Sequence, residues 1–304
     1  MKKTSIFLSS HQSLALICTF FALWLTVFFE GAIESYFGYI LIITIGILHG
    51  ANDIKLIGFH NRKRKPRNEM HVLIRYILVV ALSTIFFVFL PKIALGVFLI
   101  ISSYHFGEQH WIRKVLNKSF LSRLYFTCYG LLIFGMVFYF NSEDTSNIIY
   151  NITDLTFTKS HYGAVVLGSL FSLVGLSIYG VLSKKFVCNW YEELFLLVVF
   201  ALIFYLASLI WAFAIYFILW HSLPSLDDQI RAMYGANSKQ NLIKYLKNSW
   251  LYWLISIIGL GLTLYFFKDQ QELFHTIFFA FLAAITLPHV MVMNDVMQPS
   301  GKSD

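Results

Sequence analysis

Charged residues are scarce in this sequence. Asp, Glu, Lys and Arg make up 13% of its 304 residues, whereas a typical soluble domain contains about 25%. A soluble globule of this length exposes too much surface for so few charges to cover. The low charge content therefore excludes a soluble enzyme and a disordered protein.

Cysteine is also rare. Cys18, Cys128 and Cys188 are the only three, and they lie far apart in the sequence. This arrangement contains no CxxC or zinc-ribbon spacing, which excludes a disulfide scaffold and argues against thiol chemistry. The net charge of +7 does not indicate a nucleic-acid partner, because the basic residues lie in short loops between apolar runs, where they act as topology signals.

Long apolar runs dominate what is present. Apolar residues form 58% of the chain, and its mean hydropathy is +0.68. Runs of about 20 residues match a hydrocarbon core of about 30 Å, so we predict a single all-α domain over 1–304, a polytopic membrane bundle of eight to ten transmembrane helices. The predicted apolar segments are 12–30, 36–50, 70–90, 93–107, 120–140, 162–182, 190–221, 249–267 and 272–293.

The distribution of basic residues predicts the orientation. The largest basic cluster lies in a predicted loop at about 55–69, which the positive-inside rule places in the cytoplasm. Alternating from this loop places both termini in the cytoplasm. We therefore expect a multi-pass protein of the cell inner (plasma) membrane.

The run 190–221 is too long for one crossing. A single helix of this length would extend about 48 Å at 1.5 Å per residue, well beyond a bilayer. We predict a break near Ala207 and Ser208, although no Gly or Pro marks it. The break also keeps the basic residues of 223–248 on the cytoplasmic side, consistent with ten crossings.

Four of the ten histidines lie inside apolar runs or at their ends. An ionisable side chain in such a position is costly unless it is paired, bound to a metal or facing a cavity. In the ten-crossing topology all four runs descend toward the cytoplasm, so the imidazoles would share a similar depth. The four are His49, His105, His221 and His289.

Two explanations of these histidines remain open. Each could form a hydrogen bond between helices, or together they could bind a metal. Imidazole ligands suit iron, copper, zinc and nickel, and neutral histidines that leave coordination positions open would suit iron that handles dioxygen.

Polar residues at helical spacing are candidates to support the histidines. Asp53 is at i+4 from His49, while Glu108 and Gln109 are at i+3 and i+4 from His105, and such residues share one face of a helix. A carboxylate that accepts the ring N–H would fix the imidazole tautomer. The same carboxylates could instead pair with a cation of a neighbouring loop.

Aromatic residues, among them Tyr104 and Trp220, flank the histidines. They could line a pocket for a long planar polyene, or belong to an interfacial aromatic belt. His110 is at i+5 from His105 and so points elsewhere, which suggests a pocket or interface residue. Asp227 and Asp228 follow Pro224, and we interpret them as helix caps.

The four histidine boxes resemble those of the Brp/Blh family of integral-membrane β-carotene 15,15′-dioxygenases. They are spread over most of the chain. The matching peptides are His49-Gly50-Ala51-Asn52-Asp53, Tyr104-His105-Phe106-Gly107-Glu108, Trp220-His221-Ser222 and Leu287-Pro288-His289.

The resemblance implies cleavage of the central double bond of all-trans β-carotene by O2, giving two molecules of all-trans retinal. It also implies Fe(II) bound by His49, His105, His221 and His289, and a bacterial setting in which retinal feeds a rhodopsin. Some relatives carry a second histidine four residues after the one matching His221, where this chain has Ser225. Ser225 is therefore a further pocket candidate.

Three other kinds of membrane protein also use buried histidines. A membrane di-iron desaturase would need clustered HxxxH and HxxHH boxes, whereas these histidines are isolated. A haem-binding electron carrier would clamp haem between pairs of histidines and show a Soret band. A transporter or an opsin-assembly factor would use the histidines as proton relays or in helix contacts.

Overall fold

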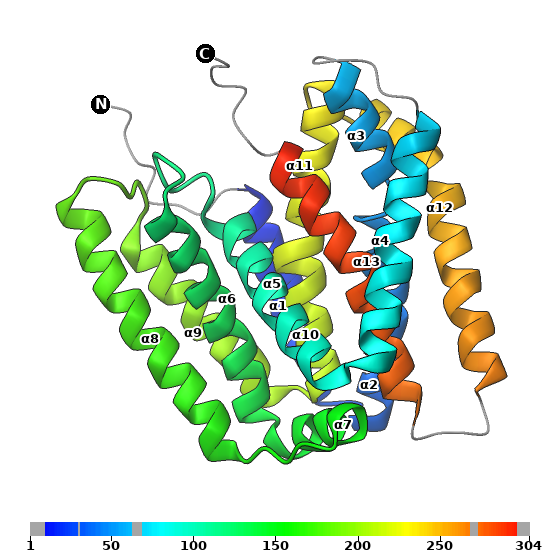
Figure 1. Ribbon diagram of the computed structural model, residues 1–304. Helices are drawn as coiled ribbons and strands as arrows, with labels where there is room; N and C mark the ends of the chain where they lie inside the picture. The colour runs from blue at the N-terminus through cyan, green and yellow to red at the C-terminus, as the bar shows by residue number, and fades with distance from the viewer. Residues whose placement is uncertain (1–9, 30, 63–68, 268–272, 297–304) are drawn as a thin grey trace. The chain divides into compact units, whose positions relative to one another are not determined.

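The computed structural model describes residues 10–29, 31–62, 69–267 and 273–296 (Figure 1). Within these ranges the chain is almost entirely helical and has no β-strand, with one isolated bridge between Val115 and Phe186. The predicted all-α fold is confirmed.

The helices follow one another with short connections. In chain order they are α1 Ser10–Thr26, α2 Gly31–Leu41, the π-helix η1 Ile42–Gly46, α3 Asp53–Arg62, α4 Glu69–Phe89, α5 Pro91–Trp111, α6 Phe120–Phe140, α7 Ser142–Thr153, α8 Lys159–Leu182, α9 Trp190–Leu206, α10 Leu209–Tyr216, the π-helix η2 Phe217–Ser222, α11 Leu223–Tyr234, α12 Lys239–Phe266 and α13 Leu273–Val296.

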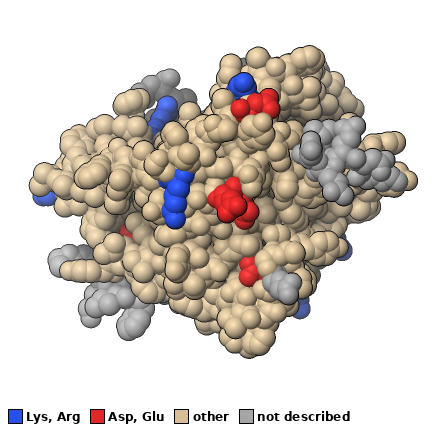
Figure 2. All heavy atoms as spheres, turned by 90° about the horizontal axis from the view of Figure 1, so that it is seen from below, with Lys and Arg blue, Asp and Glu red and all other residues tan. Residues whose placement is uncertain are grey.

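Five of the described helical spans are long and apolar enough to cross a membrane: Phe120–Phe140, Lys159–Leu182, Leu209–Tyr234, Lys239–Phe266 and Phe274–Asn294. Three shorter apolar helices accompany them, His11–Thr26, Gly31–Gly46 and Leu73–Phe89. Large apolar side chains are widely exposed, and the face in Figure 2 carries only scattered charged residues. The polytopic bundle is therefore confirmed, whereas the count of eight to ten crossings stays a prediction.

The residues group into two units that interleave along the chain. Unit 1 consists of Met1–Ile42, Ser103–Asn147 and Thr156–Pro224, and unit 2 of Ile43–Ser102, Ile148–Leu155 and Ser225–Asp304. Because their segments alternate, this division does not separate two consecutive domains. The single domain stays a prediction.

In unit 1, helices pack closely through glycine. Helices α6 and α8 lie side by side (Figure 1). A methyl group on Gly107 of α5 would overlap the carbonyl of Phe126 on α6, and one on Gly130 of α6 would overlap the carbonyl of Ser103 on α5. Ser103 and Gly107 are four residues apart on α5, and small residues at this spacing let the backbones of membrane helices touch.

The predicted break near Ala207 and Ser208 is confirmed, because α9 ends at Leu206 and α10 begins at Leu209. Side chains satisfy the backbone groups that the break exposes. The buried Glu34 carboxylate accepts a hydrogen bond from the Ser208 N–H at 2.9 Å, and the Asn141 amide donates to the Phe204 carbonyl at 3.0 Å. An unpaired backbone group in an apolar interior would cost several kcal/mol, so these two contacts allow a break without Gly or Pro.

In unit 2, α13 packs against α3, α4 and α12. A buried cluster joins α3, α12 and α13 to α11; its members are Leu56, Ile230, Met233, Tyr245, Val292 and Met293. Residues 55–62 of the predicted basic loop belong to helix α3, and 63–68 lie outside the described residues.

The helix that begins at Leu209 continues through η2 and Pro224 to Tyr234. The interpretation of Asp227 and Asp228 as helix caps is wrong, because both lie inside α11. Asp227 instead pairs with Arg231 at 2.8 Å. Pro224 is the second residue of α11 and follows the π-helix η2; prolines and π-bulges are both irregularities at which a helix kinks without ending.

Candidate metal centre

All four singled-out histidines are buried, with exposed fractions between 1% and 7%. Each unit contains one pair. In unit 1, His105 of α5 and His221 of η2 meet edge to face with ring centroids 4.8 Å apart. In unit 2, His49, which follows η1, and His289 of α13 meet in the same way at 4.7 Å.

Aromatic stacking orients the unit 1 pair. The ring of Phe106 lies on the ring of His221 at 4.1 Å with an interplanar angle of 15°. Phe217 is nearly parallel to the same imidazole at 5.7 Å. These contacts restrict rotation of the His221 ring. The π-helix itself is the kind of irregularity that occurs frequently at functional sites.

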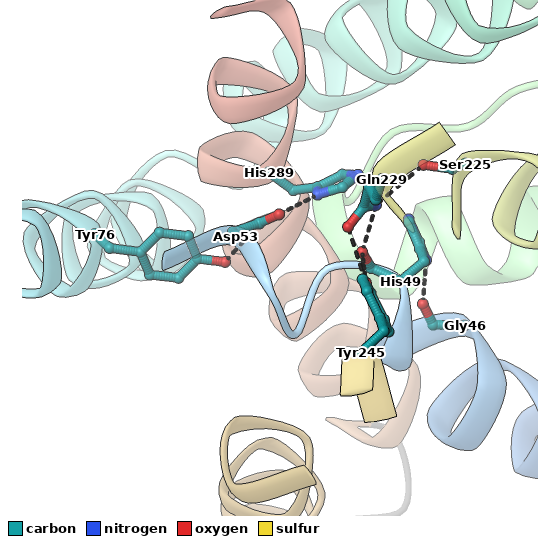
Figure 3. A network of polar contacts seen from close by, with 8 residues as sticks. All are labelled: Gly46, His49, Asp53, Tyr76, Ser225, Gln229, Tyr245 and His289. Atoms are coloured by element: carbon teal, nitrogen blue, oxygen red, sulfur yellow. Dashed lines mark hydrogen bonds and ion pairs between the residues drawn. The ribbon is translucent and has the colours of Figure 1, made fainter. Parts of the chain in front are cut away.

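Hydrogen bonds orient His49 in unit 2 (Figure 3). Its Nδ1 is hydrogen-bonded to the carbonyl of Gly46. Its own carbonyl accepts a hydrogen bond from the Gln229 amide at 2.7 Å. The single hydroxyl proton of Tyr245 is shared between Gln229 Oε1 at 2.8 Å and the His49 carbonyl at 3.3 Å. The ring and the backbone of His49 are thus held independently.

Asp53 supports a different histidine from the one its spacing suggests. Its Oδ1 lies 2.9 Å from Nδ1 of His289, and its Oδ2 accepts a hydrogen bond from the Tyr76 hydroxyl at 3.1 Å. The expected pairing with His49 does not form, because residues 49–52 are turns and α3 begins only at Asp53. The i+4 geometry of a continuous helix therefore does not apply.

Glu108 does pair with a loop cation. It accepts a hydrogen bond from Tyr104 at 2.7 Å and forms an ion pair with Lys118 at 2.8 Å. The neighbouring Gln109 is half-buried. Glu108 therefore pairs with Lys118, a cation of the neighbouring loop, as in the second of the two expected roles.

Trp220 and Ser225 are both buried, and they flank His221 in the sequence. Trp220 donates its indole N–H to the hydroxyl of Thr19 at 3.0 Å. The Ser225 hydroxyl accepts a hydrogen bond from Gln229 at 3.3 Å. Ser225 is therefore part of the polar network that holds the His49 carbonyl.

Tyr76, Gln229 and Tyr245 are functional candidates that the sequence analysis missed. One signal was available for Gln229, which lies at i+4 from Ser225 and so shares a helix face with it. The two tyrosines carry no such signal, since their contacts come from helices that are distant in sequence.

His110 belongs to a separate ionic cluster in unit 1. Its Nε2 lies 2.7 Å from Glu193 Oε2, and Lys114 reaches Glu193 Oε1 at 2.5 Å. Nearby, burial and then the Glu193 carboxylate raise the pKa of the Cys188 thiol to about 11. A thiol with such a pKa stays protonated at neutral pH, in line with the argument against thiol chemistry.

The donor set fits a divalent transition metal. Buried imidazoles are ligands that iron, copper, zinc and nickel accept. A carboxylate hydrogen-bonded to one of them, as Asp53 is to His289, is the usual partner of a metal-binding histidine. Such residues can bind a metal and keep it away from water.

Comparison with known proteins identifies the family of this chain. A sequence model of the family described as beta-carotene 15,15′-dioxygenase matches residues 40–297, a range that includes all four histidines. Neither the curated proteins nor the solved structures compared with the chain give a match. The predicted resemblance is confirmed: since the match spans most of its 304 residues, the chain belongs to the beta-carotene 15,15′-dioxygenase family.

Proposed function

We propose that the protein cleaves the central 15,15′ double bond of all-trans β-carotene with O2, giving two molecules of all-trans retinal. The observation that carries this proposal is the presence of two pairs of buried histidines in a chain of this family. Each half of the substrate gains one oxygen atom. The reaction therefore consumes O2 without a further reductant.

The proposed metal is Fe(II), with His49, His105, His221 and His289 as its ligands. Each unit contributes one buried pair of these histidines, and imidazole is a ligand that iron accepts. Bound iron would supply the site at which O2 is activated. The chain's own part is to hold the imidazoles neutral and oriented, to exclude water and to position the polyene.

The substrate and the product are both apolar, so we propose that they enter and leave through the bilayer. The large apolar side chains exposed on the helices support this route, because they would contact lipid. We also propose that the protein resides in the cell inner membrane with both termini in the cytoplasm. Retinal released there could pass directly to a rhodopsin.

Expression in bacteria that already make β-carotene tests this function. Cells with the full chain are expected to lose their orange colour and accumulate retinal, whereas cells with the empty vector keep their carotene. Purified protein is expected to contain iron without a Soret band. Unchanged carotene in iron-supplied cells, with the chain confirmed in their membranes, would contradict the proposal. A Soret band would favour the haem-binding carrier.

A pair of variants tests which residue completes the iron ligands. His289→Ala is expected to lose iron, because it removes an imidazole from the proposed set. Ser225→Ala is expected to keep iron, because it removes only a neutral hydrogen bond of about 1 kcal/mol. Iron content of the two purified proteins is the measurement. Iron lost by Ser225→Ala but retained by His289→Ala would assign the position to Ser225 instead.

A further inference from the structure

We propose that Tyr76 and Asp53 form a hydrogen-bond chain that positions His289 and presents its Nε2 to the metal. The proposal rests on the proposed function, since it assumes a metal at the histidines. It assigns a positioning role to Tyr76 and corrects the partner expected for Asp53.

The chain joins three helices of unit 2. Tyr76 comes from α4, Asp53 is the first residue of α3, and His289 lies in α13. These helices pack against one another in all three combinations. The three side chains therefore meet where the packing already fixes their backbones (Figure 3).

Both carboxylate oxygens of Asp53 are used. Oδ2 accepts from the Tyr76 hydroxyl at 3.1 Å, and Oδ1 lies 2.9 Å from Nδ1 of His289. Only 1% of Asp53 is exposed, and burying a carboxylate is costly unless hydrogen bonds compensate it. Two donors on two different oxygens hold the carboxylate plane in one orientation, so Tyr76 fixes the acceptor that His289 contacts.

This contact selects the tautomer of His289. A carboxylate accepts hydrogen bonds and donates none when ionised, so Nδ1 of His289 carries the proton and Nε2 carries the lone pair. The negative acceptor also makes the imidazole a stronger metal ligand. His49 has a neutral carbonyl, that of Gly46, in the corresponding position at its Nδ1. Both histidines of this unit therefore present the lone pair of Nε2, and His289 is expected to be the stronger metal ligand of the two.

The test compares iron binding by the purified full-length protein and three variants. Asp53→Asn is expected to weaken iron affinity by about 10–100-fold, the usual cost of losing such a partner. Tyr76→Phe, which keeps the carboxylate, is expected to weaken it less but in the same direction. Tyr125→Phe is the matched control, since it removes a hydroxyl that contacts Ser177 in unit 1.

A spectroscopic signature separates positioning from general loss of structure. The electron paramagnetic resonance spectrum of the nitric oxide adduct of the ferrous protein reports the iron ligands. We expect it to change in Asp53→Asn and Tyr76→Phe, to stay as in the wild type in Tyr125→Phe, and to recover partly in Asp53→Glu. Thermal unfolding of each variant checks that it is folded, and Tyr76→Phe keeps the test valid should Asp53→Asn not fold.

The outcomes distinguish this inference from the proposed function. A wild type that binds iron and makes retinal, with Tyr76→Phe and Asp53→Asn both matching Tyr125→Phe in affinity and spectrum, overturns the hydrogen-bond chain and leaves the proposed function in place. A wild type that neither binds iron nor makes retinal overturns both.

Discussion

Replacing His49 by alanine is expected to abolish iron binding and retinal formation while leaving the surrounding backbone in place. The loss should exceed the roughly 10–100-fold effect of removing an outer hydrogen-bond partner, because a proposed ligand itself disappears. The carbonyl of residue 49 would still accept hydrogen bonds from Gln229 and Tyr245, since these contact the main chain and not the ring. The variant therefore tests the proposed metal-binding role of the His49 ring while the contacts of its backbone are kept.

His161→Ala is the matched control for this substitution. His161 lies near the start of α8 and forms a capping box with Thr158, where loss of a cap costs about 1 kcal/mol. It should retain iron and retinal formation. The measurement is retinal formed per membrane-inserted protein, together with iron content. Retained activity in His49→Ala would remove His49 from the proposed site.

The features predicted well from the sequence are those that follow from the free-energy cost of placing polar groups in an apolar environment. A 32-residue apolar run that cannot cross a bilayer once must break, and the break at Ala207 and Ser208 is where it was expected. Four histidines inside apolar runs needed partners, and all four are buried against other rings. What the sequence could not show was that Glu34 and Asn141 are the partners of the break, since both are distant from it in the sequence.

Predictions that assumed a continuous α-helix were less successful. The turns at 49–52 separate His49 from Asp53, so the spacing of the two residues does not describe their contacts. The two π-helices have no recognisable signal in the sequence, and the helix continues past Pro224, where an end is expected. The turns and π-helices lie next to the histidines. Sequence spacing is therefore a poor guide to side-chain contacts at the candidate site.

The two histidine pairs are oriented by different forces. Stacked rings hold His221, whereas hydrogen bonds hold His49 and His289. Stacking restricts the ring plane without selecting a tautomer, while a hydrogen bond to Nδ1 does both. Substitutions around His49 and His289 should therefore alter metal affinity more strongly than substitutions of the aromatic residues around His221.

Gly107→Ala is expected to destabilise the protein and to impair the candidate site at the same time. A methyl group at this position would overlap the carbonyl of Phe126. Because the obstacle is backbone and not a flexible side chain, α5 must move away from α6. Overpacking of this kind costs 1–3 kcal/mol and occasionally more, and we expect about 3 kcal/mol here. The same movement would displace His105, two residues away, from His221, so iron binding should fall as well.

Gly168→Ala in α8 provides a control of opposite sign. Apart from its chain neighbours and the backbone of its own helix, no described atom lies within 4 Å of a methyl group built at Gly168. Alanine is favoured over glycine in a helix by about 1 kcal/mol. Thermal unfolding in detergent should therefore show a lower midpoint for Gly107→Ala and an unchanged or higher one for Gly168→Ala. Equal midpoints would mean that α5 and α6 are not held in contact by Gly107. Since Gly107 belongs to the same box as His105, its role would then have to be sought at the metal and not in helix packing.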